Sequence, residues 1–168
     1  MSKPPSVDTL LTDMSDQLRR LLQARRIERP VMIGIHTGGA WVAERLHRAL
    51  GLEDPLGTLD ISFYRDDVGT RGVQPQVRPS RLPFPVDDRT VILVDDVIYS
   101  GRTIRAALNE IFDYGRPSAV LLATLVDRGG RELPIAPDVT GAAIELPEGL
   151  QIKLQGPAPL ELVTRESR

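Results

Sequence analysis

Apolar residues recur at helical spacing in three stretches of the chain. The first begins after Ser6, a candidate N-cap, and ends before Pro30. The second runs from Ala40 to Leu50 and closes at Gly51, and the third runs from Thr103 to Tyr114. Apolar positions of the first stretch are Val7, Leu10, Leu11, Met14, Leu18, Leu21 and Leu22. The pattern therefore predicts three amphipathic helices.

Short apolar runs alternate with these helices. Four of them are strong candidates for strands: Val31–Ile35, Leu59–Tyr64, Val91–Val94 and Ala119–Val126. Weaker runs follow at Ala142–Leu146, Gln151–Leu154 and Leu160–Thr164. Continuous apolar strands that alternate with helices are typical of a doubly wound α/β fold, so we expect a mainly parallel sheet flanked by helices.

The length of 168 residues fits a single domain, residues 1–168, with its own apolar core. One stretch within it, residues 65–89, is long, charged and rich in glycine and proline. Loops of this length in a small domain are usually functional, mobile or both, so we predict a flexible active-site loop, in which 76–78 could form a hairpin arm.

Composition excludes several kinds of chemistry. The chain has no cysteine, which rules out disulfides, thiolate-bound zinc and a cysteine nucleophile and fits a cytoplasmic protein. The net charge of −2 argues against bulk binding of DNA, although five arginines cluster between positions 19 and 29. We expect neither a membrane span nor a signal peptide, since no long apolar run exists and Met1–Asp8 has no apolar core.

Three loops rich in polar residues and glycine follow buried strands, after Ile35, Val94 and Val126. In a parallel sheet these loops all lie at the carboxyl edge, where such folds bind ligands. The pattern therefore predicts one active site built from all three loops.

The stretch from Val91 to Ile104 carries the clearest chemistry. Asp95 and Asp96 follow a buried strand, and Gly101 precedes a helix whose free N–H groups suit a phosphate dianion. Adjacent carboxylates would repel that phosphate but suit sugar hydroxyls or a hydrated Mg²⁺ ion. The stretch lacks the Gly-Lys-Ser/Thr of a P-loop and the glycine triplet of a dinucleotide fold.

This stretch resembles the signature with which type I phosphoribosyltransferases bind 5-phosphoribosyl-1-pyrophosphate (PRPP). The resemblance implies that Asp95 and Asp96 are catalytic residues that bind the ribose 2′ and 3′ hydroxyls. It also implies Mg²⁺ as cofactor, carried mainly by PRPP and water, with no direct protein ligand assigned. The residues implied to wrap the 5-phosphate are Val97, Ile98, Tyr99, Ser100, Gly101, Arg102 and Thr103.

The likeness extends over the segments Asp60–Asp67, Phe112–Pro117 and Val126–Pro134. Together they resemble one branch of the family, the bifunctional pyrimidine-operon regulatory proteins with uracil phosphoribosyltransferase activity. This likeness implies a hood within residues 127–168 that covers uracil. Asp127, Arg128 and Arg131 are the hood residues implied to lie over the nucleobase, with Arg131 in contact with the ligand. It also implies that Arg78, in the long loop, closes over pyrophosphate as a catalytic residue.

The pyrophosphate loop departs from the family pattern. The family commonly has Lys-Thr-Arg-Gly where this chain has His36, Thr37, Gly38 and Gly39. Two cations are thus replaced by a titratable histidine and a glycine. Pyrophosphate would then depend on Mg²⁺, Arg78 and backbone donors.

The resemblance implies transfer of the phosphoribosyl group of PRPP to uracil, giving UMP and pyrophosphate, together with regulation of pyrimidine genes. Two alternatives remain open at this point. The chain could be a catalytically weak nucleotide sensor that binds an mRNA leader through its early arginines. It could also be a purine-base phosphoribosyltransferase, because the stretch from Val91 to Ile104 is implied to contact only the ribose phosphate. The family likeness also implies a homodimer or a tetramer.

Overall fold

The structure, a computed structural model, describes residues 3–61 and 80–167. Three helices lie in this part of the chain: α1 (Val7–Ala24), α2 (Gly38–Leu50) and α3 (Arg102–Tyr114). Its strands are β1 (Val31–Ile35), β2 (Gly57–Leu59), β3 (Thr90–Ile98), β4 (Ala119–Asp127), β5 (Val139–Ala143), β6 (Leu150–Gln155) and β7 (Glu161–Glu166). None of the described helices is both long and apolar enough to cross a membrane.

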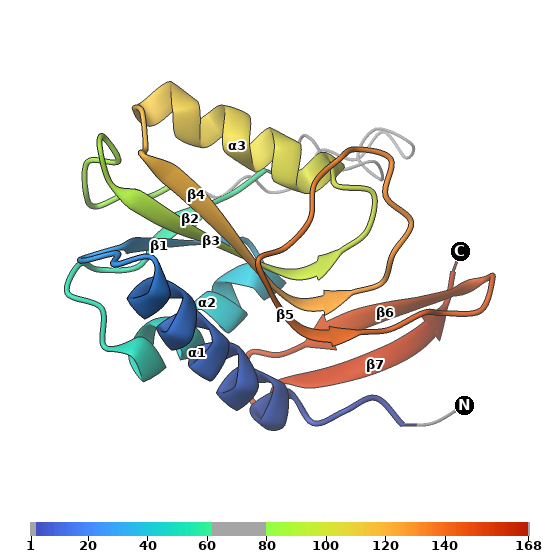
Figure 1. Cartoon of the computed structure of the whole chain (residues 1–168). Helices are drawn as coiled ribbons and strands as arrows, with labels where there is room; N and C mark the ends of the chain where they lie inside the picture. The colour runs from blue at the N-terminus through green and yellow to red at the C-terminus, as the bar shows by residue number, and fades with distance from the viewer. Residues whose placement is uncertain (1–2, 62–79, 168) are drawn as a thin grey trace.

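Five strands form one sheet in the order β2-β1-β3-β4-β5, and every pairing in it is parallel. Figure 1 shows α3 on one face of this sheet and α1 with α2 on the other. The remaining strands, β6 and β7, pair antiparallel in a separate small sheet. The expected α/β fold, a parallel sheet flanked by helices, is confirmed.

The core is divided by the sheet into two apolar clusters. Met32, Ile92 and Val94 belong to the cluster that packs against α1 and α2, whereas Ile33 and Leu93 belong to the one beneath α3. Successive residues of a strand point to opposite faces, so strands with apolar residues at every position bury both sides. The small sheet contributes Ile152, Leu154 and Leu162 to the α1–α2 side.

Two predicted strands are placed differently in the structure. Strand β2 ends at Leu59, so the predicted strand Leu59–Tyr64 is not formed at Asp60 and Ile61, and residues 62–64 lie outside the described part. Strand β5 begins at Val139 rather than at Ala142. Glycine is uncommon inside strands, but a Cβ on Gly141 would lie 2.5 Å from the Leu125 carbonyl oxygen, so the close pairing with β4 favours glycine here.

Only residues 80–89 of the predicted active-site loop are described, and they are anchored. Thr58 and Arg81 exchange two backbone hydrogen bonds of 2.8 Å, and Phe84 and Val86 are buried in the core. The Ser80 hydroxyl donates to Glu110 Oε1 at 2.7 Å and accepts the Asp60 N–H at 3.3 Å. The prediction of a loop that closes over the site therefore now concerns residues before Ser80, which lie outside the described residues.

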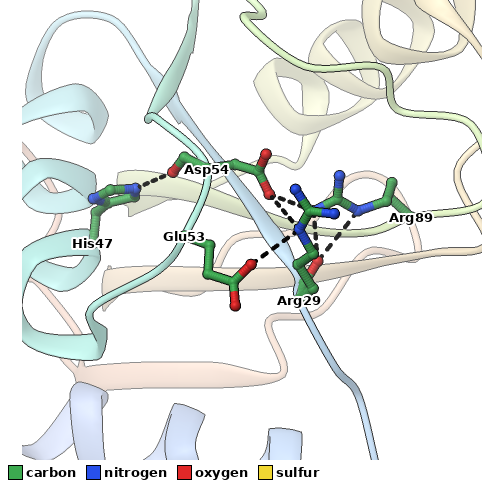
Figure 2. A network of polar contacts seen from close by, with 5 residues as sticks. All are labelled: Arg29, His47, Glu53, Asp54 and Arg89. Carbon is green, nitrogen blue, oxygen red and sulfur yellow. Dashed lines mark hydrogen bonds and ion pairs between the residues drawn. The ribbon is translucent and has the colours of Figure 1, made fainter.

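A polar network ties the opposite, amino-terminal edge of the sheet together (Figure 2). Arg89, just before β3, donates to the Arg29 carbonyl oxygen at 2.7 Å and to Asp54 Oδ2 at 2.6 Å. Arg29, before β1, lies 3.2 Å from Glu53, and His47 Nε2 donates to the Asp54 carbonyl oxygen at 2.7 Å. The hydrogen bond from Arg89 lowers the pKa of Asp54 below its ordinary value. His47 is thus a structural residue at the edge far from the predicted site.

Candidate active site

The sheet is stepped at its carboxyl edge. The pairing of β1 with β3 ends at Gly34 and Val94, whereas the pairing of β3 with β4 continues to Ile98 and Asp127. Strand β3 therefore runs beyond the predicted Val91–Val94, and Asp95 and Asp96 lie on its extension. The chain after β1 turns into α2 beside this extension, which brings two of the predicted loops together.

The two carboxylates are oriented by the backbone beside them. Asp95 is 2% exposed, and its Oδ1 accepts the Asp96 N–H at 2.9 Å. Asp96 Oδ1 in turn accepts the Val97 N–H at 2.8 Å. The neighbour of Asp95 across the sheet is Thr124, whose buried hydroxyl has no hydrogen-bond partner among the described residues. This pair of acids suits the recognition of vicinal hydroxyls, because each group is preset by a bond to the main chain.

The loop His36–Gly39 packs directly on these acids. A Cβ on Gly38 would overlap the Asp96 carboxylate, and one on Gly39 would lie 2.8 Å from the Val94 carbonyl oxygen. The His36 N–H donates to the Leu59 carbonyl oxygen at 2.8 Å, and the peptide between His36 and Thr37 is cis. Both glycines are thus needed for the approach of this loop to β3, and α2 begins at Gly38, before the predicted Ala40.

The loop between β3 and α3 encloses a cavity of about 100 Å³. Gly101 has φ of 94°, in the left-handed region that favours glycine, and it precedes the first residue of α3. The Ser100 hydroxyl accepts the Arg102 N–H at 3.2 Å. The cavity is lined by Asp95, Val97, Ile98, Tyr99, Ser100, Gly101, Thr103 and Ile104. N–H groups at a helix start beside a cavity suit an anion, so the phosphate site that the sequence predicts here stays a prediction.

Arg102 differs from the other residues predicted to wrap the phosphate. It is not among the residues that line the cavity, and its Nε donates to Glu132 Oε2 at 3.0 Å. Both side chains of this pair are about half exposed, at 50% and 52%. The backbone N–H of Arg102 donates to the Ser100 hydroxyl, and the contribution of Arg102 to phosphate binding stays a prediction.

The segment after β4 lies against residues 98–101, the loop between β3 and α3 that we call the phosphate loop. Arg131 forms two hydrogen bonds with the Asp127 carboxylate, at 3.0 and 2.8 Å, and the Arg128 guanidinium lies 4.2 Å from the centre of the Tyr99 ring. The hydrogen bond from Arg131 holds the pKa of Asp127 below its ordinary value, against the opposing effect of burial. Asp127, Arg128 and Arg131 are therefore brought together beside the cavity, whereas Arg78 lies outside the described residues.

Sequence reasoning missed several residues of this site. Thr124 lies in the middle of an apolar strand, so its polar side chain opposite Asp95 was read as part of a buried β4. Leu133 and Ile135 would be the nearest neighbours of a Cβ on Gly101, at 3.5 and 3.6 Å, and so they cover the phosphate loop. Only a signal that links residues across the sheet could have found them, because nothing local marks them as functional.

The described residues contain no group of three or more His, Cys, Asp or Glu side chains that could bind a metal ion. They do contain the adjacent carboxylates of Asp95 and Asp96, which suit a hydrated cation better than a dehydrated one. The site is thus compatible with Mg²⁺ that arrives with a phosphorylated ligand and contacts the protein through hydroxyls and water.

The chain matches the family model described as "Phosphoribosyl transferase domain" over residues 6–157. It is 60% identical over 158 residues to "Bifunctional protein PyrR" of Pseudomonas paraeruginosa, which covers 94% of this chain and 93% of that protein. A protein of the same name from Nitrosococcus oceani is 55% identical, with coverage of 93% and 89%.

Two solved structures with the same fold are named as phosphoribosyltransferases of purine bases. A hypoxanthine phosphoribosyltransferase from Staphylococcus aureus has a TM-score of 0.67 at 17% identity, covering 89% of this chain and 79% of that one. A purine phosphoribosyltransferase from Pyrococcus horikoshii has a TM-score of 0.63 at 28% identity, with 83% of each chain covered. With its stepped parallel sheet, its paired acids and a family match over most of its length, the chain belongs to the type I phosphoribosyltransferases, in the branch of the bifunctional PyrR proteins.

Proposed function

We infer that the chain transfers the phosphoribosyl group of PRPP to uracil, giving UMP and pyrophosphate. One observation carries this inference: the paired acids, the cavity at the start of α3 and the segment after β4 meet at one edge of one sheet. These three features supply adjacent candidate surfaces for the ribose, the phosphate and the base of one nucleotide. Identities of 55–60% to PyrR proteins, against 17–28% to the solved purine enzymes, favour uracil over a purine as the acceptor.

The chain's own residues act mainly by positioning. Asp95 and Asp96 hold the ribose hydroxyls, and the N–H groups of the loop before α3 hold the 5-phosphate. The bond from ribose C1 to pyrophosphate then breaks, positive charge develops on the ribose, and uracil N1 forms the new bond to C1 while its proton passes to the departing pyrophosphate or to water. Backbone donors of the loop His36–Gly39 receive the departing pyrophosphate, which places the two reactants for in-line displacement.

Magnesium fits this scheme as a companion of the substrate. The adjacent carboxylates favour a hydrated ion, and the described residues hold no cluster of His, Cys, Asp or Glu side chains that could coordinate a dehydrated one. When bound, Mg²⁺ neutralises charge on the pyrophosphate. Asp95 and Asp96 would interact with it through the ribose hydroxyls or through water.

The test is a direct assay of the purified chain with PRPP, Mg²⁺ and labelled uracil. We expect labelled UMP that forms only when PRPP is present. A thermal-shift panel with UMP, GMP and IMP at equal concentration then separates the acceptor classes, because the nucleotide that binds more tightly raises the melting temperature more. No UMP at high enzyme concentration, or a larger shift with IMP than with UMP, would reject the proposal.

Regulation of pyrimidine genes is the second activity that the branch supports. The relatives are named bifunctional, and an RNA leader is the expected partner. Three of the early arginines, however, are engaged in ion pairs: Arg19 with Asp16, Arg25 with Asp138, and Arg29 with Glu53 and Asp54. These pairs reduce the positive charge that residues 19–29 offer to a phosphate backbone.

Binding to RNA is tested by titrating labelled pyrimidine-operon leader RNA with the chain, with and without UMP, at several salt concentrations. If the chain is an RNA regulator, UMP tightens binding and affinity falls steeply with salt. Absence of binding near micromolar protein would leave catalysis as the activity of this chain. A homodimer or tetramer and a cytoplasmic location are further expectations, the first of which sedimentation can measure.

A further inference from the structure

We propose that Arg131 is a positioning residue, rather than a ligand of the acceptor base. It ties residues 127–135 after β4, which we call the base segment, to the phosphate loop. This inference rests on the proposed function and refines it at the same site. It revises the role that family resemblance implies for Arg131, which is contact with uracil. The argument starts from the donors of the guanidinium group.

All three nitrogens of Arg131 are engaged within the protein. Nε donates to the Ile135 carbonyl oxygen at 2.7 Å, and Nη1 donates to the Tyr99 carbonyl oxygen at 3.0 Å. Nη1 and Nη2 also donate to the two carboxylate oxygens of Asp127, at 3.0 and 2.8 Å. A guanidinium has five N–H groups, so these bonds occupy most of its capacity and leave little for a ligand.

Backbone bonds join the same two segments. The Arg128 N–H donates to the Ile98 carbonyl oxygen at 3.2 Å. The N–H groups of Glu132 and Leu133 both donate to the Ser100 carbonyl oxygen, at 2.9 and 3.1 Å. With the bond from Arg131 to Tyr99, three consecutive carbonyl groups of the phosphate loop are bonded to the segment after β4. Among these, the bond to Tyr99 is the one made by a side chain.

The Tyr99 side chain reinforces the contact. The Arg128 guanidinium stacks over its ring at 4.2 Å, a cation–π arrangement. Gly130, at φ of 82°, approaches the ring so closely that a Cβ there would overlap it. The base segment and the phosphate loop are therefore joined by side-chain packing as well as by backbone hydrogen bonds.

These bonds bear on the phosphate through peptide geometry. In a planar trans peptide the C=O of one residue points opposite to the N–H of the next. Carbonyl groups of 98, 99 and 100 that face the base segment therefore turn the N–H groups of 99, 100 and 101 away from it. Those N–H groups belong to the loop around the cavity, so Arg131 helps to aim the donors that a 5-phosphate would need.

The two roles of Arg131 predict different effects of Arg131→Lys. A base ligand would affect uracil alone, so the KM for uracil would rise while the Kd for PRPP, measured by calorimetry without uracil, stayed at the wild-type value. A positioning residue, once replaced, would weaken PRPP binding in the absence of any base, because a lysine has three N–H donors and no planar fork and so cannot make all four bonds of Arg131. We expect the Kd for PRPP to rise about tenfold, the effect of losing one charge-assisted bond.

Arg48→Lys is the matched control. Arg48 and Glu44 also form an i, i+4 ion pair, but their side chains are 73% and 64% exposed, against 23% and 25% for Arg131 and Asp127. The control variant should bind PRPP as the wild type does. Asp127→Asn tests the same contact from the partner of Arg131. It weakens the bidentate Arg131–Asp127 pair, while the amide oxygen can still accept the Gly129 N–H.

Energetic coupling between Arg131 and Asp127 distinguishes a specific positioning contact from a general loss of structure. If Arg131 acts through Asp127, the double variant Asp127→Asn/Arg131→Lys binds PRPP no more weakly than the worse single variant, with circular dichroism unchanged in all three. A wild-type Kd for PRPP in Arg131→Lys, or fully additive losses, would overturn the positioning role while leaving the proposed function intact. A wild-type chain that binds neither PRPP nor UMP would overturn both.

Discussion

The carboxylate of Asp96 occupies the space in which a side chain of residue 38 would begin. A Cβ on Gly38 would lie 2.7 Å from Asp96 Cγ and closer still to its Oδ2. The glycine that replaces the family's arginine is therefore matched to the position of the acid across the loop. It allows the start of α2 to lie directly against the extension of β3.

Replacing Gly38 by alanine should thus impair the site. The new methyl group forces either Asp96 or the loop His36–Gly39 to move, and we expect kcat/KM for PRPP to fall at least about tenfold, which corresponds to about 1.4 kcal/mol. Steady-state kinetics at varied PRPP measures the loss. The same change in an Asp96→Ala background should cost much less, because the overlapping group is gone. Equal losses in both backgrounds would contradict the steric explanation.

Asp95→Asn should weaken the binding of PRPP with little change in fold. The amide keeps an oxygen that can accept the Asp96 N–H, but it loses the charge that strengthens bonds from ribose hydroxyls. Loss of a hydrogen bond to a charged group costs about 1.5–3 kcal/mol, so the Kd for PRPP should rise roughly 10- to 100-fold. Calorimetric titration with PRPP and Mg²⁺ measures it. Asp113→Asn, on an exposed position of α3, is the control and should bind normally.

The Asp54–Arg89 pair should make the stability depend on pH. The folded state lowers the pKa of Asp54 from its ordinary value of 3.8, chiefly through the bond from Arg89. The ionised carboxylate therefore stabilises the fold at pH values above that ordinary pKa, and this contribution is lost as the pH falls through the lower, folded value. Asp54→Asn should be less stable than wild type at pH 7, and the difference should shrink below about pH 4.

Urea denaturation at several pH values tests this prediction. Glu44→Gln, which removes an exposed pair with Arg48, should show almost no difference from wild type at any pH. If the gap between wild type and Asp54→Asn stays constant on acidification, the ion pair of Figure 2 does not contribute in the way proposed.

Ser80→Ala should destabilise the join between α3 and the end of β2. The Ser80 hydroxyl connects Glu110 Oε1 to the Asp60 N–H, and Glu110 Oε2 is already buried without a hydrogen-bond partner among the described residues. Removing the hydroxyl deprives a partly buried carboxylate of a donor, which costs about 1–3 kcal/mol. The urea midpoint measures the change. Ser118→Ala, at an exposed position, serves as the control and should be neutral within about 0.5 kcal/mol.

Much of the fold could be predicted because local pattern and tertiary structure agree. The strand Val31–Ile35 and the helix ending at Tyr114 are found as expected, since their apolar spacing is strict and glycine or proline marks their ends. The sequence also predicts Asp95 and Asp96 at the carboxyl end of Val91–Val94, and they follow that apolar run, although β3 continues past them to Ile98. The family of the chain could be recognised because the motif from Val91 to Ile104 lies within one short segment.

The remainder depends on contacts between distant segments. Strand β5 begins before its apolar run because Asp138 Oδ2 accepts the Leu122 N–H at 2.8 Å and starts the pairing. Beyond Val94, β3 continues through the acidic Asp95 and Asp96 because it stays paired with β4 as far as Ile98. The engagement of Arg131 with Tyr99 spans 32 residues of sequence, so no local signal distinguishes it from a free, ligand-binding arginine.

The step in the sheet has a consequence for the entropy of the reaction. Strands β3 and β4 remain paired to Ile98 and Asp127, so the loop for phosphate and the segment for the base both start from one two-stranded extension. Their separation is established when the chain folds, and a thermal displacement of the extension carries both together. Much of the ordering that two separate substrates require is thus already present before either arrives.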